Sequence, residues 1–163
     1  MNVTVNLYGF LTMYDEKILT LYNSIIQNHS RAPQNQSPIN VITHQAIAIN
    51  KFCGDEVQLN LKYNQNNFNI SDLQLIAKGC SISIASSSIV STLIIGLSSK
   101  KINLTRQIFE KMLDNQNITD TEIRLLGDLI YFQPLSQIQI RKKCSLLIWN
   151  SIENIKPLNP IEI

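Results

Sequence analysis

The dipeptide Gly79-Cys80 divides the sequence into two parts with different hydrophobic patterns. Over residues 42–77, directly upstream of it, apolar residues alternate with polar ones, which is typical of β-strands. Downstream, residues 81–97 carry no charge, and apolar side chains recur at helical spacing at Ile82, Ala85, Ile89 and Leu93. Strands first and helices afterwards predict an α+β domain, in which helices pack on one face of an antiparallel sheet.

The upstream part predicts a three-stranded antiparallel β-meander. The first strand covers residues 42–51. In the second, apolar residues alternate with polar ones at Val57, Leu59, Leu61 and Tyr63. A polar turn at residues 64–67 leads to the third strand, where a shift of phase at Ser71-Asp72 indicates a β-bulge.

Helical periodicity also predicts four further helices, at residues 15–29, 102–113, 119–131 and 143–155. Residues 1–14 are interpreted as an N-terminal arm and residues 15–163 as a single domain. A chain of 163 residues is long enough to bury one sizeable core.

Charge and cysteine content exclude several classes of partner. The net charge is only +2 and the basic residues form no long tract, so we expect no binding to nucleic acid. The uncharged residues 81–97 are too few, and contain too many serines, to cross a membrane, so no membrane association is expected. Three cysteines without a recognisable signal peptide predict a reducing, cytoplasmic location rather than a disulfide framework.

The predicted meander brings cysteines together. Its first and third strands run in the same direction, so Cys53 and Cys80, which follow their ends, lie at the same edge of the sheet. Gly54 allows a sharp bend, through which Asp55 can share an ion with Cys53. Cys144, expected in the first turn of the last helix, lies on its inward apolar stripe and reaches the same point if the helix begins over this edge.

Three thiolates and a carboxylate form a tetrahedral, sulfur-rich site suited to zinc or an iron–sulfur unit. The predicted metal ligands are Cys53, Asp55, Cys80 and Cys144. The alternative for each cysteine is a small buried hydrophobic residue. His29 and His44 are expected at the surface or at helix ends rather than at a metal, and Arg141 to Lys143 at a solvated helix start. The serines of residues 83–91 are expected to allow close helix packing.

Three segments together resemble the NifU/IscU-like iron–sulfur cluster assembly proteins. They are residues 50–55 (Asn-Lys-Phe-Cys-Gly-Asp), 79–88 (Gly-Cys-Ser-Ile-Ser-Ile-Ala-Ser-Ser-Ser) and 141–149 (Arg-Lys-Lys-Cys-Ser-Leu-Leu-Ile-Trp). Residues 29–35 (His-Ser-Arg-Ala-Pro-Gln-Asn) resemble the family's His-x-x-x-Pro-x-Asn turn.

Within that family, three features resemble the SufU type. Cys80 and Cys144 are 64 positions apart, which resembles the longer insertion of SufU. Lys143 stands where the IscU type has a histidine, and residues 135–140 do not contain the Leu-Pro-Pro-Val-Lys motif of the IscU type.

The resemblance implies a SufE/NifU-like fold and a zinc-dependent sulfurtransferase. Such a protein accepts persulfide sulfur from a pyridoxal-phosphate (PLP)-dependent cysteine desulfurase of the SufS type and passes it toward a downstream iron–sulfur scaffold. Cys53 would be the catalytic sulfur acceptor, and Arg141, which matches an arginine common just before the last cysteine, would contact the partner.

Two alternatives remain open at this point. In the first, the same four residues hold iron in a nascent [2Fe-2S] cluster and the protein is a scaffold, against which Lys143 in place of histidine argues. In the second, the protein is a structural zinc adaptor without sulfur chemistry, for which a closed, buried metal site would be expected.

Overall fold

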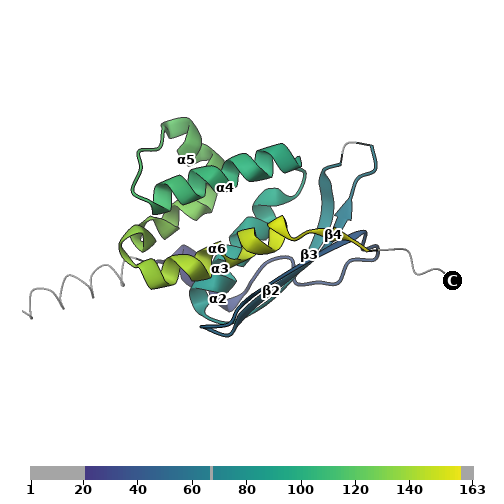
Figure 1. Cartoon of the computed structure of the whole chain (residues 1–163), viewed down its shortest axis with the longest axis horizontal. Coiled ribbons are helices and arrows are strands. Elements are labelled where there is room, and N and C mark those ends of the chain that lie inside the picture. Colours follow the sequence, from purple (N-terminus) through teal and green to yellow (C-terminus); the bar gives the residue numbers. More distant parts are fainter. Residues whose placement is uncertain (1–20, 67, 159–163) are drawn as a thin grey trace, which may run out of the picture.

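The computed structural model describes residues 21–66 and 68–158, which form an antiparallel sheet with helices on one face (Figure 1). The strands are β1 (His44–Asn50), β2 (Asp55–Tyr63), β3 (Ile70–Lys78) and β4 (Lys156–Pro157). The helices are α2 (Ser24–Arg31), α3 (Ser81–Ile94), α4 (Ser99–Leu113), α5 (Asp120–Leu126), the 3-10 helix η1 (Gly127–Gln137) and α6 (Gln139–Glu153). The predicted α+β class is confirmed, and the predicted N-terminal arm, residues 1–14, lies outside the described residues.

The described sheet has four strands in the order β3-β2-β1-β4, one more than predicted. β4 pairs with the start of β1 through two residues, a length at which no alternation can be read from sequence. The predicted bulge is present, because Lys62 pairs with Asp72 and Tyr63 with Ile70, which leaves Ser71 as the extra residue. The Ser71 hydroxyl donates to the Lys62 carbonyl at 3.0 Å.

The core lies between the sheet and the helices. Alternate residues of β2 and β3 are buried against it: Val57, Leu59, Leu61, Leu73 and Leu75. On the opposite face, Ile47 and Ile49 are exposed. α6 packs on β1 and β2 while α3 packs on β3, so the two helices that carry Cys144 and Cys80 cover the same side of the sheet.

The serines of α3 hold neighbouring segments, a role beyond the close packing predicted for them. The Ser86 hydroxyl donates to the Ser145 carbonyl of α6 at 2.7 Å. Ser88 Oγ accepts from the Gln34 backbone N–H at 2.8 Å and lies 2.7 Å from Nδ1 of His29. The His-x-x-x-Pro-x-Asn turn is therefore fastened to α3 by hydrogen bonds.

Four predicted helices have different boundaries, and the one predicted over 102–113 is α4, which begins at Ser99. Asn23 caps a helix that begins at Ser24, which interrupts the helix predicted from residue 15; residues 15–20 lie outside the described range. The helix predicted over 119–131 ends at Leu126, because Gly127 adopts a left-handed φ of 52° and a 3-10 helix follows.

The last helix begins at Gln139 rather than at Lys143, so Cys144 lies in its second turn and not in its first. The residue before it, Ile138, provides no side-chain cap, and this start therefore leaves no capping signal in the sequence.

Candidate metal centre

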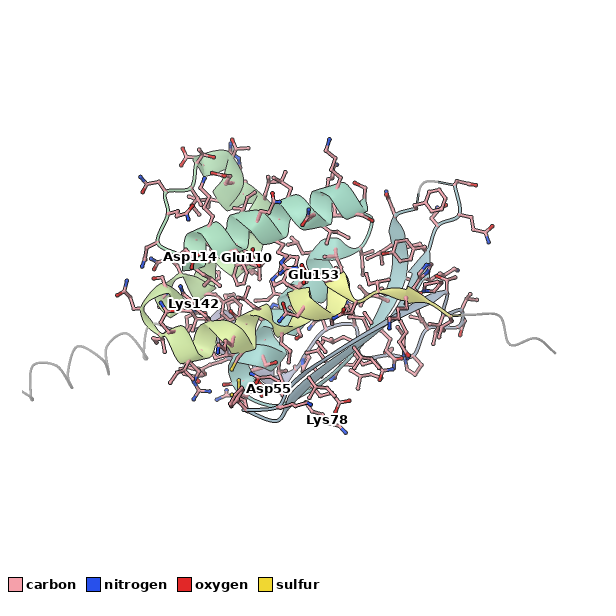
Figure 2. All side chains as sticks on the ribbon, viewed as in Figure 1. Asp55, Lys78, Glu110, Asp114, Lys142 and Glu153 are labelled. Atoms are coloured by element: carbon pink, nitrogen blue, oxygen red, sulfur yellow. The ribbon has the colours of Figure 1, made fainter. Side chains whose placement is uncertain are left out.

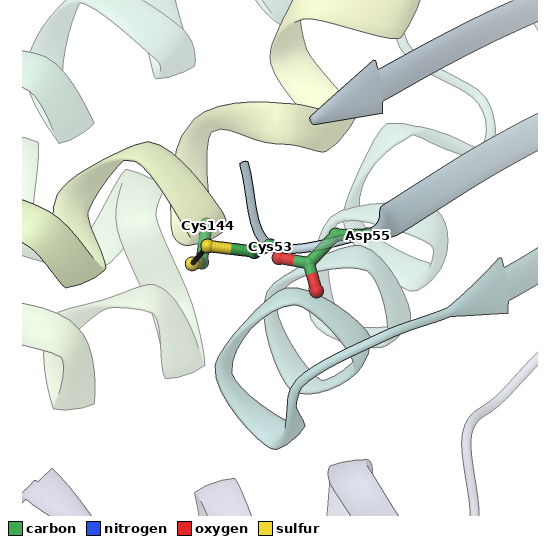
Figure 3. Close-up of side chains that lie close together, drawn as sticks. All are labelled: Cys53, Asp55 and Cys144. Atoms are coloured by element: carbon green, nitrogen blue, oxygen red, sulfur yellow. Dashed lines mark hydrogen bonds between the residues drawn. The ribbon is translucent and has the colours of Figure 1, made fainter. Parts of the chain in front are cut away.

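Four separate structural positions bring the predicted ligands to one edge of the sheet. Figure 3 shows three of these ligands, Cys53, Asp55 and Cys144. Cys53 lies in the turn between β1 and β2, and Asp55 is the first residue of β2. Cys80 is the N-cap of α3, and Cys144 lies in α6. Cys53 is exposed and Cys80 is half-buried, whereas the side chains of Asp55 and Cys144 are buried.

The ligand atoms lie at distances that suit a tetrahedral ion. The two sulfur atoms of Cys53 and Cys144 are 4.0 Å apart, and a carboxylate oxygen of Asp55 lies within 4.8 Å of both. Sγ of Cys80 is 3.6 Å from Oδ2 of Asp55. Around tetrahedral zinc, two sulfur ligands are about 3.8 Å apart, and a sulfur and an oxygen are about 3.6 Å apart. Cys53, Asp55 and Cys144 therefore form a group whose donor atoms and spacing suit a metal ion such as zinc, whereas Cys80 lies beside Asp55 and outside this group.

Asp55 is fixed by the start of α3. The Cys80 backbone N–H donates to Oδ1 of Asp55 at 2.8 Å, and Sγ of Cys80 accepts from the Ser83 N–H at 3.4 Å. This carboxylate is fully buried, and the Cys80 N–H offsets part of the cost of removing it from water.

Gly79 is a site residue whose role sequence reasoning missed. Its φ is +134°, and a Cβ at this position would lie 2.1 Å from Oδ1 of Asp55 and 2.8 Å from the Asp55 Cα. Only a glycine leaves room for the carboxylate beneath the Cys80 N–H. The signal in the sequence is the Gly-Cys pair at the end of a strand, but the contact partner cannot be read from it.

Burial is the main cause that raises the pKa of the Cys144 thiol above its ordinary value, and the neighbouring Cys80 and Asp55 raise it further. Without a metal ion this thiol keeps its proton at neutral pH, so binding a cation as thiolate requires that the proton leave.

Positive charge lies next to the thiols. Partial burial opposes the charged form of Arg141, but the nearby Tyr22, Cys80 and Cys144 outweigh this effect and raise its pKa. Lys142, predicted at a solvated helix start, is instead largely buried, with its ammonium 3.0 Å from Oδ1 of Asp114 (Figure 2). This ion pair ties α6 to the C-terminal end of α4.

The two histidines contact hydroxyl groups rather than the predicted metal ligands. Nδ1 of His29 is 2.7 Å from the Ser88 hydroxyl, and Nδ1 of His44 is 2.9 Å from the Thr43 hydroxyl. The described cluster of potential ligands contains neither of them.

Comparison with known proteins gives consistent matches. The family described as NifU-like N terminal domain matches residues 21–145. The chain is 28% identical over 138 residues to the iron-sulfur cluster assembly scaffold protein IscU of Streptococcus pyogenes serotype M1, covering 84% of this chain and 83% of the relative. It is 29% identical over 143 residues to the zinc-dependent sulfurtransferase SufU of Bacillus subtilis strain 168, covering 86% of this chain and 92% of the relative.

Among solved structures, a similar chain is a putative iron-sulfur cluster assembly scaffold protein for the SUF system from Fervidobacterium islandicum AW-1. The TM-score is 0.73 at 26% identity, over 82% of this chain and 95% of that one. Within residues 21–66 and 68–158, no helix combines the length and apolar character required to cross a membrane.

Proposed function

The chain belongs to the NifU-like N-terminal domain family, and from this premise we propose that it is a zinc-dependent sulfurtransferase of iron–sulfur cluster assembly. It accepts persulfide sulfur from a SufS-type, PLP-dependent cysteine desulfurase and passes it to a downstream iron–sulfur scaffold. The observation that carries the proposal is the cluster formed by the exposed thiol of Cys53, the buried thiol of Cys144 and the buried carboxylate of Asp55, with Sγ of Cys80 3.6 Å from that carboxylate.

The ligands for zinc are Cys53, Asp55, Cys80 and Cys144. Zinc, when bound, keeps coordinating thiols deprotonated at neutral pH. Asp55 and Cys144 are buried in β2 and α6, and Cys80 caps α3, so these three are held by secondary structure. Cys53 lies in a turn next to Gly54, whose φ is +70°, and is the residue that moves with least cost to the fold.

The transfer step is a thiol–persulfide exchange. The Cys53 thiolate attacks the terminal sulfur of the donor's Cys–S–SH group and forms a new S–S bond. The donor's S–S bond breaks at the same time, and the donor cysteine leaves as a thiolate. Cys53 then carries the persulfide, and no net oxidation or reduction occurs. The exposed Arg141 offers a positive charge to the partner beside these sulfurs.

A second candidate is a scaffold that holds a nascent [2Fe-2S] cluster on the same ligands, which the name of the IscU relative favours. Lys143 in place of histidine argues against it. A purely structural zinc site is less well supported, because such sites are closed, whereas Cys53 is exposed to solvent.

The test is mass spectrometry after incubation with a SufS-type desulfurase, PLP and cysteine. We expect a mass increase of one sulfur, mapped to the peptide that contains Cys53, and a colourless preparation that contains zinc. Cys53→Ala is expected to keep its fold and lose stimulation of the desulfurase, and Asp55→Ala to reduce turnover while the Cys53 thiol remains. Sulfur mapped to Cys80 or Cys144 in the wild type would contradict this role of Cys53. A brown preparation containing iron would favour the scaffold.

A further inference from the structure

The exposed side of the metal centre opens on a hollow of about 310 Å³. Its described lining comes from the β1–β2 turn and the start of α6: Asn50, Phe52, Cys53, Gln139, Ile140 and Lys143. Cys53 lines this hollow, so any molecule that reaches its sulfur from solvent on this side passes the other five residues.

Two of these residues are unusually exposed for apolar side chains. Phe52 is 96% exposed and Ile140 is 77% exposed, the two highest values among the large apolar residues that the structure describes. Phe52 is held in this position by its turn, because its backbone N–H donates to Oδ1 of Asn50 at 3.1 Å. Scattered apolar residues are normal on a surface, but a pair that lines one hollow beside a reactive thiol indicates a place where another molecule binds.

The exposed charged residues in and beside the lining of the hollow are positive. Lys143 is the one charged residue in its described lining, and Lys51 and Arg141, the chain neighbours of Phe52 and Ile140, are also exposed. Among the residues that the structure describes, none of these three cations forms an ion pair, whereas the adjacent Lys142 is paired with Asp114. The surface is therefore complementary to an apolar group flanked by carboxylates.

We propose that Phe52 and Ile140 are the docking anchors for the sulfur-donating protein. The segment of the donor that carries its persulfide places an apolar side chain against this pair, while acidic residues of the donor face Lys143 and its cationic neighbours. The inference rests on the proposed function: sulfur transfer requires the two sulfur atoms to come within about 3.5 Å of each other. A donor that close to Cys53 enters the hollow that Phe52 and Ile140 also line.

The test compares Phe52→Ala and Ile140→Ala with wild type, using a purified SufS-type cysteine desulfurase. The readouts are the Kd of the complex, the zinc content, and the KM and kcat of the desulfurase with this protein as acceptor. Removing a central apolar anchor is expected to raise Kd and KM at least ten-fold for Phe52→Ala, with a smaller rise for Ile140→Ala. Zinc content and melting temperature are expected to stay at wild-type values, because neither side chain is buried.

Phe68→Ala is the matched control. Phe68 is 72% exposed but lies in the β2–β3 hairpin, two residues before the start of β3 and at the opposite end of β2 from Cys53. Its Kd and KM are expected to remain within two-fold of wild type. Lys143→Glu is expected to slow association and to weaken its dependence on salt, because electrostatic steering acts on the association rate.

The outcomes separate the two proposals. If wild type accepts sulfur on Cys53 while Phe52→Ala and Ile140→Ala bind the desulfurase as wild type does, the docking inference is wrong and the proposed function stands. If Phe68→Ala weakens binding as much as Phe52→Ala does, the specific role of the pair is also refuted. If wild type accepts no sulfur at all, the proposed function fails and the docking inference fails with it.

Discussion

Gly79→Ala is the substitution whose effect on the metal centre follows most directly from the structure. The new Cβ would lie 2.1 Å from Oδ1, 2.7 Å from Cγ and 2.8 Å from Cα of Asp55. The first two atoms belong to a side chain, but Cα is backbone of β2 and cannot rotate away. Either the carboxylate leaves its position or the start of α3 separates from the sheet.

Two contributions set the size of the expected decrease in the free energy of unfolding. An alanine at a φ of +134° costs about 1–3 kcal/mol in backbone strain. Loss of the hydrogen bond from the Cys80 N–H to the buried Asp55 carboxylate costs about 1.5–3 kcal/mol, because the acceptor is charged. The free energy of unfolding is therefore expected to fall by about 2.5–6 kcal/mol, a large part of the total stability of a typical domain. Zinc affinity is expected to fall as well, since Asp55 is displaced.

The assay is urea unfolding with and without added zinc, together with the zinc content of the purified protein. Gly96→Ala is the matched control, because Gly96 also has a positive φ, +79°, but a Cβ there would meet nothing within 4 Å. It is expected to lose only the strain of a left-handed residue, about 1–2 kcal/mol, and to keep its zinc. If Gly79→Ala retains zinc and is no less stable than Gly96→Ala, the close approach of Asp55 to this glycine is not needed for the site.

Three further predictions concern the metal, the thiols and pH. The purified protein is expected to contain about one zinc per chain. Cys80→Ala and Cys144→Ala are each expected to lose the zinc and to melt at a lower temperature. Wild-type protein with intact thiols but no zinc would contradict this prediction. In zinc-free protein, the thiol oxidant diamide is expected to form a disulfide between Cys53 and Cys144, whose sulfurs are 4.0 Å apart. Bound zinc is expected to protect both thiols from this oxidation. Peptide mapping that finds Cys80 in the disulfide would refute the predicted pairing. Burial lowers the pKa of His29 below 6.5, with Asp128 opposing, so the unfolded chain binds this proton more readily. Neutral His29 therefore contributes fully to the free energy of unfolding above pH 6.5, and this contribution is lost as the pH falls through 6.5 toward the folded pKa. Melting temperatures measured over a series of pH values should show this loss in wild type but not in His29→Asn.

Much of the sheet could be predicted from local pattern. Val57, Leu59 and Leu61 are buried, as their alternation indicates, because side chains of a strand point alternately to its two faces. Ser71 is the extra residue of a bulge at the point where the alternation shifts. Helix boundaries could be predicted less accurately from the sequence. Leu126 ends α5 because Gly127 turns left-handed, yet an isolated glycine is also tolerated within helices.

The order of strands and helices, the buried faces of the strands and the placement of Cys53 and Cys80 after strand ends are properties of the sequence alone. They depend on interactions between residues near one another along the chain. The exposure of Cys53, the approach of its sulfur to that of Cys144 and the contact between Gly79 and Asp55 were decided by tertiary structure. Each depends on where α6 crosses the sheet edge and how closely α3 approaches β2. That packing joins segments distant in sequence, and no local pattern of residues specifies it.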